Sequence, residues 1–184
     1  MGINQFTGLT DEEFASLYLT PKPYNPEWEK VDTEFKVGAN IDWVAKGMVS
    51  PVKDQGRCGS CWAFSAVGTL ESQSLMKGGN ARLSEQQLVD CSRKYGNAGC
   101  NGGFNYQGLA YVKDHGIASD SKYPYVGHNQ GCKMDGGDYK ISRVDSAKGC
   151  TGIQTALQSR PIGVSVDANN WSPYKSGIFN NCKK

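Results

Sequence analysis

The chain has 184 residues, of which 38% are hydrophobic and 21% charged, and its formal net charge is +2. This length fits one domain or two small lobes, and the small net charge excludes a protein that binds nucleic acid through a strongly basic surface. No apolar run is long enough to span a membrane, and the first residues lack the charged and apolar regions of a signal peptide. The seven cysteines predict three disulfides and one remaining thiol if the compartment is oxidising.

The first 37 residues differ in charge from the rest of the chain. They carry seven acidic and three basic side chains, whereas residues 38–184 carry eleven acidic and seventeen basic ones. Such an acidic leader either docks on the basic body or extends into solvent, and the composition slightly favours a solvated tail.

Two signals predict the local structure of this leader. Thr10 with Glu13 three residues later is a capping box, which predicts a short helix through Leu17. The prolines of the segment 20–26 exclude a regular helix, because proline lacks an N–H group and restricts the residue before it. We therefore expect a short helix followed by an extended linker.

In the body, helical patterns come first and strand patterns later. Small or apolar residues recur at helical spacing from Ala63 to Leu70, and Ser84–Gln87 forms a second capping box. Apolar residues alternate from Ile162 to Val166, as they do in strands. The predicted helices cover 61–77, 85–91, 104–114 and 150–159, and the predicted strands lie near 139–144 and at 162–166. This order indicates an α+β protein with two segregated lobes.

One stretch carries a specific signature. Cys58-Gly59-Ser60-Cys61-Trp62 matches the pattern C-G-[SA]-C-[WY] of papain and the cathepsins. Six further blocks look like family blocks in the family's order: Asp42-Trp43, Pro51–Gly56, Leu83–Cys91, Gly99–Gly103, Tyr123–Tyr125 and Gly177–Phe179. The chain therefore resembles the papain family of cysteine peptidases and is most similar to its cathepsin L-like branch.

This resemblance implies a fold and an activity. The fold is the papain-like two-lobe fold, with a helical lobe at about 45–135 and a β-rich lobe that starts at about 136 and is truncated at the C-terminus. The activity is that of a thiol-dependent endopeptidase, which hydrolyses peptide bonds in proteins through an acyl-enzyme. No cofactor and no metal are expected.

The resemblance also gives an expectation for the leader. Gly2, Asn4, Phe6 and the segment 10–14 resemble the end of the family's inhibitory propeptide, although Gly8 stands where the family usually has Asp. We therefore expect residues 1–37 to be a propeptide remnant with a linker, and residues 38–184 to be an incomplete peptidase domain.

Cys61 is the candidate nucleophile. A thiol is only a few per cent thiolate at neutral pH, and a position at a helix N-terminus favours the anion. Gln55 resembles the family's oxyanion donor, so its side-chain amide and the backbone N–H of Cys61 would stabilise the oxyanion that develops on the substrate.

The family's substrate-binding positions can be placed on this sequence by resemblance. Backbone pairing with an extended peptide is expected at the glycines, and an apolar substrate side chain two positions before the cut is expected near Phe104, Asn105 and Ser165. The expected substrate-binding residues are Gly59, Trp62, Gly102, Gly103, Phe104 and Ser165.

The resemblance further implies two disulfides, Cys58–Cys100 and Cys91–Cys132. Cys150 with Cys182 is a third candidate pair. Six cysteines allow fifteen connectivities, so the sequence by itself leaves the pairing open.

A general base is missing from the expected place. The family's His and Asn follow the nucleophile by about 130–150 residues, which is beyond Lys184. His115 ends a predicted helix and His128 lies in a turn-like loop, so neither matches the family's catalytic block. We therefore expect a fragment that is inactive by itself.

Partners and rival functions complete the expectations. Protein substrates and the protein's own propeptide are the expected partners of a lysosomal or secreted monomer, with no nucleic acid and no membrane. The main rival is a non-catalytic family member that acts as a binding protein. Two others are a thioredoxin-like redox site at Cys58 and Cys61, and a zinc site built from Cys58, Cys61, Cys91 and Cys100.

Overall fold

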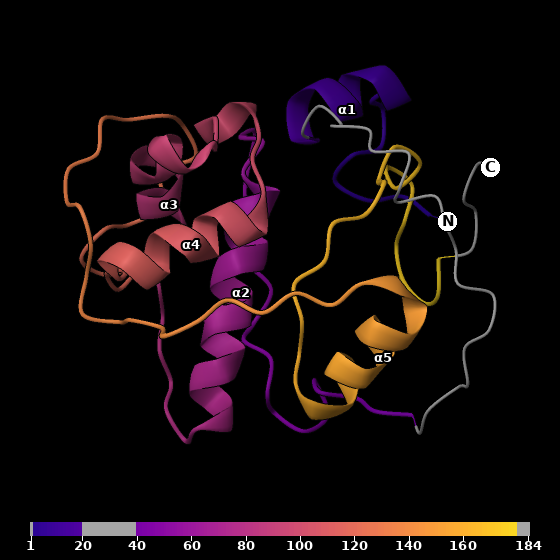
Figure 1. The fold of residues 1–184 in the computed structure, drawn as a ribbon. Helices are drawn as coiled ribbons and strands as arrows, with labels where there is room; N and C mark the ends of the chain where they lie inside the picture. The colour runs from indigo at the N-terminus through magenta and orange to yellow at the C-terminus, as the bar shows by residue number, and fades with distance from the viewer. Residues whose placement is uncertain (1, 20–39, 180–184) are drawn as a thin grey trace.

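The computed structural model describes residues 2–19 and 40–179. The predicted linker at 20–26 and Cys182 lie outside the described residues. Five α-helices occur in the described part of the chain: α1 (Asp11–Tyr18), α2 (Cys61–Met76), α3 (Glu85–Cys91), α4 (Asn105–His115) and α5 (Gly149–Ser159). Two short 3₁₀ helices, η2 (Ser92–Tyr95) and η3 (Gly99–Asn101), connect α3 to α4. Figure 1 shows α2, α3 and α4 gathered on one side, with α1 and α5 on the other.

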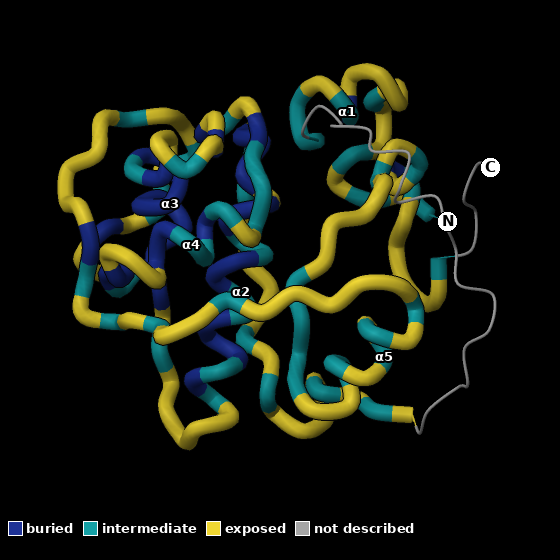
Figure 2. The backbone as a smooth tube through the Cα atoms, viewed as in Figure 1, coloured by how far each residue is buried: buried dark blue, intermediate teal, exposed yellow. Residues whose placement is uncertain are grey.

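The main hydrophobic core lies between α2, α3 and α4. The residues of α2 that recur at helical spacing are almost fully buried, which confirms the predicted face of this helix. Leu88 of α3 and Val112 of α4 are completely buried against that face. Figure 2 shows the buried backbone concentrated in these three helices, whereas α5 has no buried residue. The core residues of α2 are Trp62, Ala63, Ala66, Val67 and Leu70.

One of the two predicted capping boxes is complete. The Glu13 N–H donates to Thr10 Oγ1 at 3.1 Å, and the Thr10 N–H donates to Glu13 Oε2 at 2.8 Å. At α3 the box is only half made. Ser84 Oγ accepts from the Gln87 N–H, but the Ser84 N–H donates to the carbonyl of Ala118 instead of to Gln87. Because that donor is already satisfied, the Gln87 side chain is left to bind elsewhere.

The predicted strands are wrong for the described residues. The segments 139–144 and 162–166 form no strand, and the only bridges in the described part of the chain are Leu83 with Ser119 and Ile117 with Tyr139. An alternating pattern supplies a face to bury but not the hydrogen-bonded neighbour that a strand requires. Val164 and Val166 accordingly remain 52% and 59% exposed. The β-rich character expected for the second lobe is therefore absent from the described residues.

An ion-pair cluster joins the start of the body to α2 and α3. Lys53 Nζ lies 2.7 Å from Glu71 Oε1 and 2.6 Å from Glu85 Oε1. Both carboxylates are almost fully buried. Burial by itself would lower the pKa of Lys53, but the hydrogen bonds and charges of the two glutamates outweigh burial and raise it. Burial raises the pKa of Glu85, although Lys53 opposes that shift.

Replacing Lys53 by Met is expected to destabilise the fold in a pH-dependent way. The substitution removes the cation that both buried carboxylates share and leaves only Arg82, at 3.9 Å from Glu71, so the free energy of unfolding should fall by about 3 kcal/mol at pH 7. When folding raises the pKa of a carboxyl group, the group contributes to the stability of the fold at low pH. That contribution is lost as the pH rises above the ordinary pKa of 4.5. The loss should therefore be smaller at pH 4, where Glu85 can be protonated.

Urea unfolding of the variant and the wild type at the two pH values measures this difference. Lys122→Met is the matched control, because Lys122 pairs with Asp138 at the exposed surface and such pairs contribute at most about 1 kcal/mol. If Lys53→Met lowered the free energy of unfolding equally at pH 4 and pH 7, the buried charges would not be the cause of the destabilisation.

Candidate active site

Cys61 is the first residue of α2, and its side chain is exposed. Its neighbour Cys58 is buried and forms a disulfide with Cys100 of η3. The Gly59 N–H donates to the carbonyl of Cys100 at 2.9 Å, and a Cβ atom at Gly59 would lie only 2.5 Å from that oxygen. The turn before Cys61 is therefore fixed to η3 by a covalent bond and a backbone hydrogen bond at a position where a side chain does not fit.

The Gln55 amide points into the same turn. Its Nε2 donates to the carbonyl of Cys58 at 2.9 Å and to the carbonyl of Tyr18 at 3.0 Å. The first bond fixes the side chain of Gln55 to the turn that precedes Cys61. The second bond is made to the leader, so a backbone carbonyl from another part of the chain already occupies the candidate oxyanion donor.

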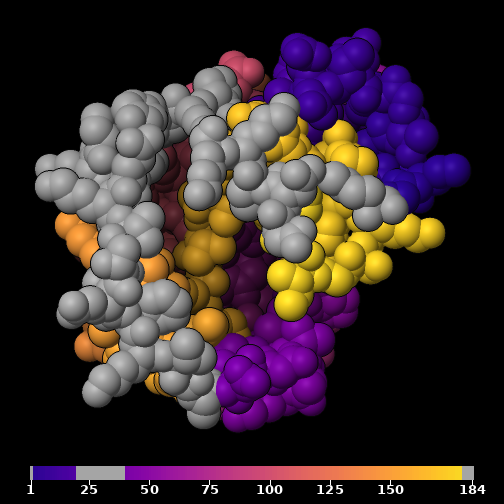
Figure 3. Space-filling view, turned by 90° about the vertical axis from the view of Figure 1, so that its right-hand side faces the viewer, coloured from indigo at the N-terminus to yellow at the C-terminus, as the bar shows by residue number. Residues whose placement is uncertain are grey.

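The described part of the leader, residues 2–19, docks on the body. Asn4 Nδ2 donates to the carbonyls of Ser172 and Tyr174, both at 2.7 Å, and Ser172 Oγ donates to Asp11 at 3.2 Å. Figure 3 shows the leader, in indigo, beside the last described segment, in yellow. The expectation of a solvated tail is therefore wrong for these residues. Composition cannot reveal contacts that are made through backbone carbonyls.

The glycines expected to bind substrate lie beside α2. Gly102 has a φ of +119°, and Gly103 lies so close to Trp62 that a Cβ atom would be 2.8 Å from the indole ring. The Trp62 side chain is 4% exposed, and its Nε1 donates to the carbonyl of Gly99 at 3.1 Å. Gly102 and Gly103 are called the glycine strip below. Trp62 packs against this strip from the core.

Two further expected residues lie at the start of α4 and after α5. Phe104 is the N-cap of α4, and its N–H donates to Asn97 Oδ1 at 2.8 Å. Ser165 is exposed. Gly163, two residues earlier, lies against Ser65 of α2, since a Cβ atom there would be 2.8 Å from Ser65 Oγ. The segment 162–166 thus runs past the first half of α2.

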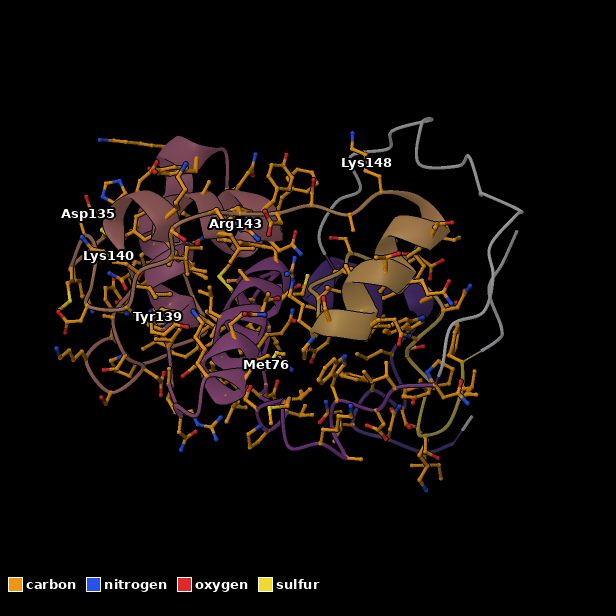
Figure 4. The ribbon with its side chains drawn as sticks, turned by 60° about the horizontal axis from the view of Figure 1, so that its bottom comes forward. Met76, Asp135, Tyr139, Lys140, Arg143 and Lys148 are labelled. Atoms are coloured by element: carbon orange, nitrogen blue, oxygen red, sulfur yellow. A yellow bond between two sulfur atoms is a disulfide. The ribbon has the colours of Figure 1, made fainter. Side chains whose placement is uncertain are left out.

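A separate cavity of about 430 Å³ lies at the other half of α2. Its lining includes Leu70, Tyr139, Arg143 and Arg160, but neither Cys61 nor Gln55. Figure 4 labels Tyr139, Lys140 and Arg143 along the segment that runs past α2 towards α5. This cavity is therefore not part of the candidate active site. In the described part of the chain, no helix is both long and apolar enough to cross a membrane, and no cluster of side chains is suited to hold a metal ion.

Residues 37–184 match the family model described as papain family cysteine protease. The chain belongs to the papain family. It is 42% identical to a cathepsin L-like proteinase of Phaedon cochleariae and 40% identical to cathepsin L2 of Homo sapiens, over 97% of this chain in each case. The match covers 58% and 57% of those relatives, so the chain spans less than two thirds of their length.

Solved structures support the papain-like fold of this family member. A recombinant stem bromelain precursor matches 99% of the chain with a TM-score of 0.78 and 34% identity, and the match covers 62% of that protein. Digestive procathepsin L 3 of Tenebrio molitor matches 73% of the chain with a TM-score of 0.58 and 40% identity, over 44% of its own length.

The disulfides of this papain-family chain exclude two of the rival functions. Cys58 is bonded to Cys100 and Cys91 to Cys132, which are the pairings that the resemblance implies. Cys58 and Cys61 are therefore not a redox pair, and the proposed zinc ligands are not available as a set of thiolates. Cys150 is bonded to no described cysteine, and its proposed partner lies outside the described residues.

The two histidines contact residues that are not among the candidate site residues. His115, at the end of α4, stacks on Tyr111 with ring centroids 4.9 Å apart, and its Nδ1 lies 3.3 Å from Asp135. His128 Nδ1 lies 3.1 Å from the carbonyl of Val126. The expectation that neither histidine acts as the family's base stays a prediction.

Three contributors to the site were not identified from the sequence. Tyr18 contributes a backbone carbonyl, which leaves no signal in a side-chain pattern. Ser60 was visible only as a variable position of the signature. Tyr125 was visible only as part of a family block, yet its hydroxyl lies 2.7 Å from both the carbonyl of Gln55 and the hydroxyl of Ser60.

Replacing Gly103 by Ala is expected to destabilise the fold at the glycine strip. The added methyl group would collide with Asn97 Oδ1 and with the indole of Trp62, and overpacking of this kind lowers the free energy of unfolding by roughly 1–3 kcal/mol. Gly68→Ala in α2 is the control, since a Cβ atom there meets nothing within 4 Å and alanine favours the helix by about 1 kcal/mol. Thermal or urea unfolding measures both. A Gly103→Ala variant as stable as Gly68→Ala would contradict the packing described here.

Proposed function

We propose that the protein is a cysteine endopeptidase in which Cys61 is the nucleophile. The observation that carries the proposal is the bond from Gln55 Nε2 to the backbone carbonyl of Tyr18, because the same amide also binds Cys58 in the turn that precedes the exposed thiol of Cys61. An amide that binds a peptide carbonyl beside a thiol is the arrangement that acyl transfer requires. The similarity to cathepsin L-like proteinases supports the same chemistry.

In the proposed reaction, the thiolate of Cys61 attacks the carbonyl carbon of the scissile peptide bond. The Gln55 amide and the Cys61 backbone N–H donate hydrogen bonds to the oxyanion that forms. The amine leaves after it gains a proton, and water then hydrolyses the thioester that remains. The proton transfers require a general acid and base, and the contacts of His115 and His128 do not favour either histidine for that role.

The proposed substrate is an extended peptide. Gly102 and Gly103 would pair with its backbone, while Phe104 and Ser165 would lie near an apolar side chain two positions before the cut. The two disulfides support an oxidising compartment, which is consistent with a lysosomal or secreted monomer.

We further propose that residues 1–37 are a propeptide remnant with its linker, and that residues 38–184 belong to the peptidase domain. The docking of residues 2–19 and the contact between Tyr18 and Gln55 support this division. The similar proteins of known structure include a procathepsin and a bromelain precursor, which supports the same division. The leader would inhibit the enzyme because it takes the donor that a substrate carbonyl needs.

Replacing Cys61 by Ala is expected to abolish both peptide hydrolysis by the gene product that carries this sequence and its labelling by a peptidyl epoxide. The thiol is the only group in the proposal that forms the covalent intermediate. Cys150→Ala is the matched control, because Cys150 is also outside the two disulfides but is not part of the site. Mass spectrometry of the labelled protein and a fluorogenic peptide assay provide the readouts. Undiminished hydrolysis by Cys61→Ala would refute the assignment.

Replacing Asn4 by Ala is expected to speed up the labelling of Cys61 by a peptidyl epoxide. The change removes two hydrogen bonds that hold the leader, each worth about 1 kcal/mol, so the leader should open more often and labelling should accelerate by up to roughly thirtyfold. Gln5→Ala is the control, since Gln5 is exposed. Identical labelling rates for both variants would mean that leader docking does not limit access to the site.

A further inference from the structure

Tyr125 connects the two halves of the candidate active site. Its hydroxyl oxygen lies 2.7 Å from the backbone carbonyl of Gln55 and 2.7 Å from the hydroxyl of Ser60. Gln55 carries the candidate oxyanion donor, and Ser60 is the N-cap of the helix that begins with Cys61. Tyr125 reaches both from a segment 65 residues further along the chain.

The direction of these two hydrogen bonds follows from the groups involved. A tyrosine hydroxyl has one proton, and a carbonyl oxygen can only accept, so Tyr125 donates to Gln55. The Ser60 hydroxyl must then donate to the oxygen of Tyr125. Burial raises the pKa of Tyr125, so its hydroxyl stays protonated and continues to donate.

Packing fixes the ring that carries this hydroxyl. The rings of Tyr125 and Phe64 meet edge to face with centroids 4.9 Å apart, and Phe64 lies in the first turn of α2. Ser60 is completely buried. Without Tyr125, the Ser60 hydroxyl would have only the carbonyl of Cys58, at 3.4 Å, as a described partner. A buried donor left with so long a bond is unfavourable, so the turn would be expected to shift.

The bond to Tyr125 also explains an unusual helix start. A serine at the N-cap ordinarily accepts a hydrogen bond from the second or third N–H of the helix, but the Ser60 side chain makes no such bond. Its hydroxyl is directed to Tyr125 instead. The side chain of Ser60 therefore does not compete for the N–H groups at the start of α2, where the proposed oxyanion forms.

We propose that Tyr125 is a positioning residue that holds the backbone of Gln55 in register with the first turn of α2. This inference rests on the proposed function. Tyr125 does not touch the substrate. It fixes the distance between the Gln55 amide and Cys61, so that one carbonyl group can meet both the donor and the nucleophile.

The test compares Tyr125→Phe with Tyr123→Phe. The Tyr123 hydroxyl is also hydrogen-bonded, to Asp90 at 2.8 Å, but it makes no described bond to the turn 55–60. Two thiol reagents are used on the gene product that carries this sequence. A peptide aldehyde forms a hemithioacetal whose oxygen needs the oxyanion donors, whereas iodoacetamide alkylates the thiol by displacement and needs none.

The expected result is a selective loss. Tyr125→Phe should weaken binding of the aldehyde by about tenfold, less than the 10²–10³ in rate lost when an oxyanion donor is removed outright. The rate of Cys61 alkylation by iodoacetamide should change less than about twofold, because a displacement at the thiol does not use these donors. Tyr123→Phe should leave both values unchanged. Ser60→Ala, which removes the other half of the link, should also weaken aldehyde binding, and the double variant should be no worse than Tyr125→Phe.

Several results would overturn the inference. Unchanged aldehyde binding in Tyr125→Phe and Ser60→Ala, or an equal loss in Tyr123→Phe, would mean that Tyr125 contributes only to stability. If Tyr125→Phe does not fold, Ser60→Ala carries the same comparison. A wild-type protein that reacts with iodoacetamide at Cys61 but does not bind the aldehyde would refute the proposed function itself, which is a different outcome from the loss of the Tyr125 effect alone.

Discussion

The link between Cys58 and Cys100 is the constraint on which the candidate site depends. The disulfide closes a loop of 42 residues, and in the chain-entropy account such a loop stabilises the fold by about 4 kcal/mol. The backbone bond from Gly59 to Cys100 holds the same two segments together. This junction therefore fixes the position of the turn before Cys61 relative to η3, which directly precedes the glycine strip at Gly102.

Both the leader and the candidate oxyanion donor depend on that junction. The Gln55 amide binds the carbonyl of Cys58 and the carbonyl of Tyr18 with nearly equal distances. The first bond lies within the candidate site, whereas the second is made to the leader and is the one that a substrate carbonyl would replace in the proposed reaction. Because a single N–H group serves either the leader or a substrate, inhibition and catalysis compete for one donor in the proposed enzyme.

Local signals predicted the helices well and the rest of the fold poorly. The buried face of α2 and the capping box at Thr10 depend on residues three or four positions apart, which a sequence displays directly. The candidate nucleophile, Cys61, is predicted from five adjacent residues. By contrast, a strand at 162–166 requires a partner far away in the chain, and its alternating pattern carries no information about whether that partner is present.

The contacts that escaped prediction share one property, which is that a buried or partly buried polar side chain binds the backbone of a distant segment. Gln87 of α3 accepts from the Ala118 N–H and donates to the carbonyls of Met134 and Gly136. Tyr125 binds the carbonyl of Gln55 in the same manner. Where segments are irregular, such bonds replace the ladder of a sheet and satisfy backbone groups one at a time. Each of these side chains therefore joins segments that are distant in the chain, and in the proposed role of Tyr125 a single hydroxyl group outside the site fixes the geometry within it.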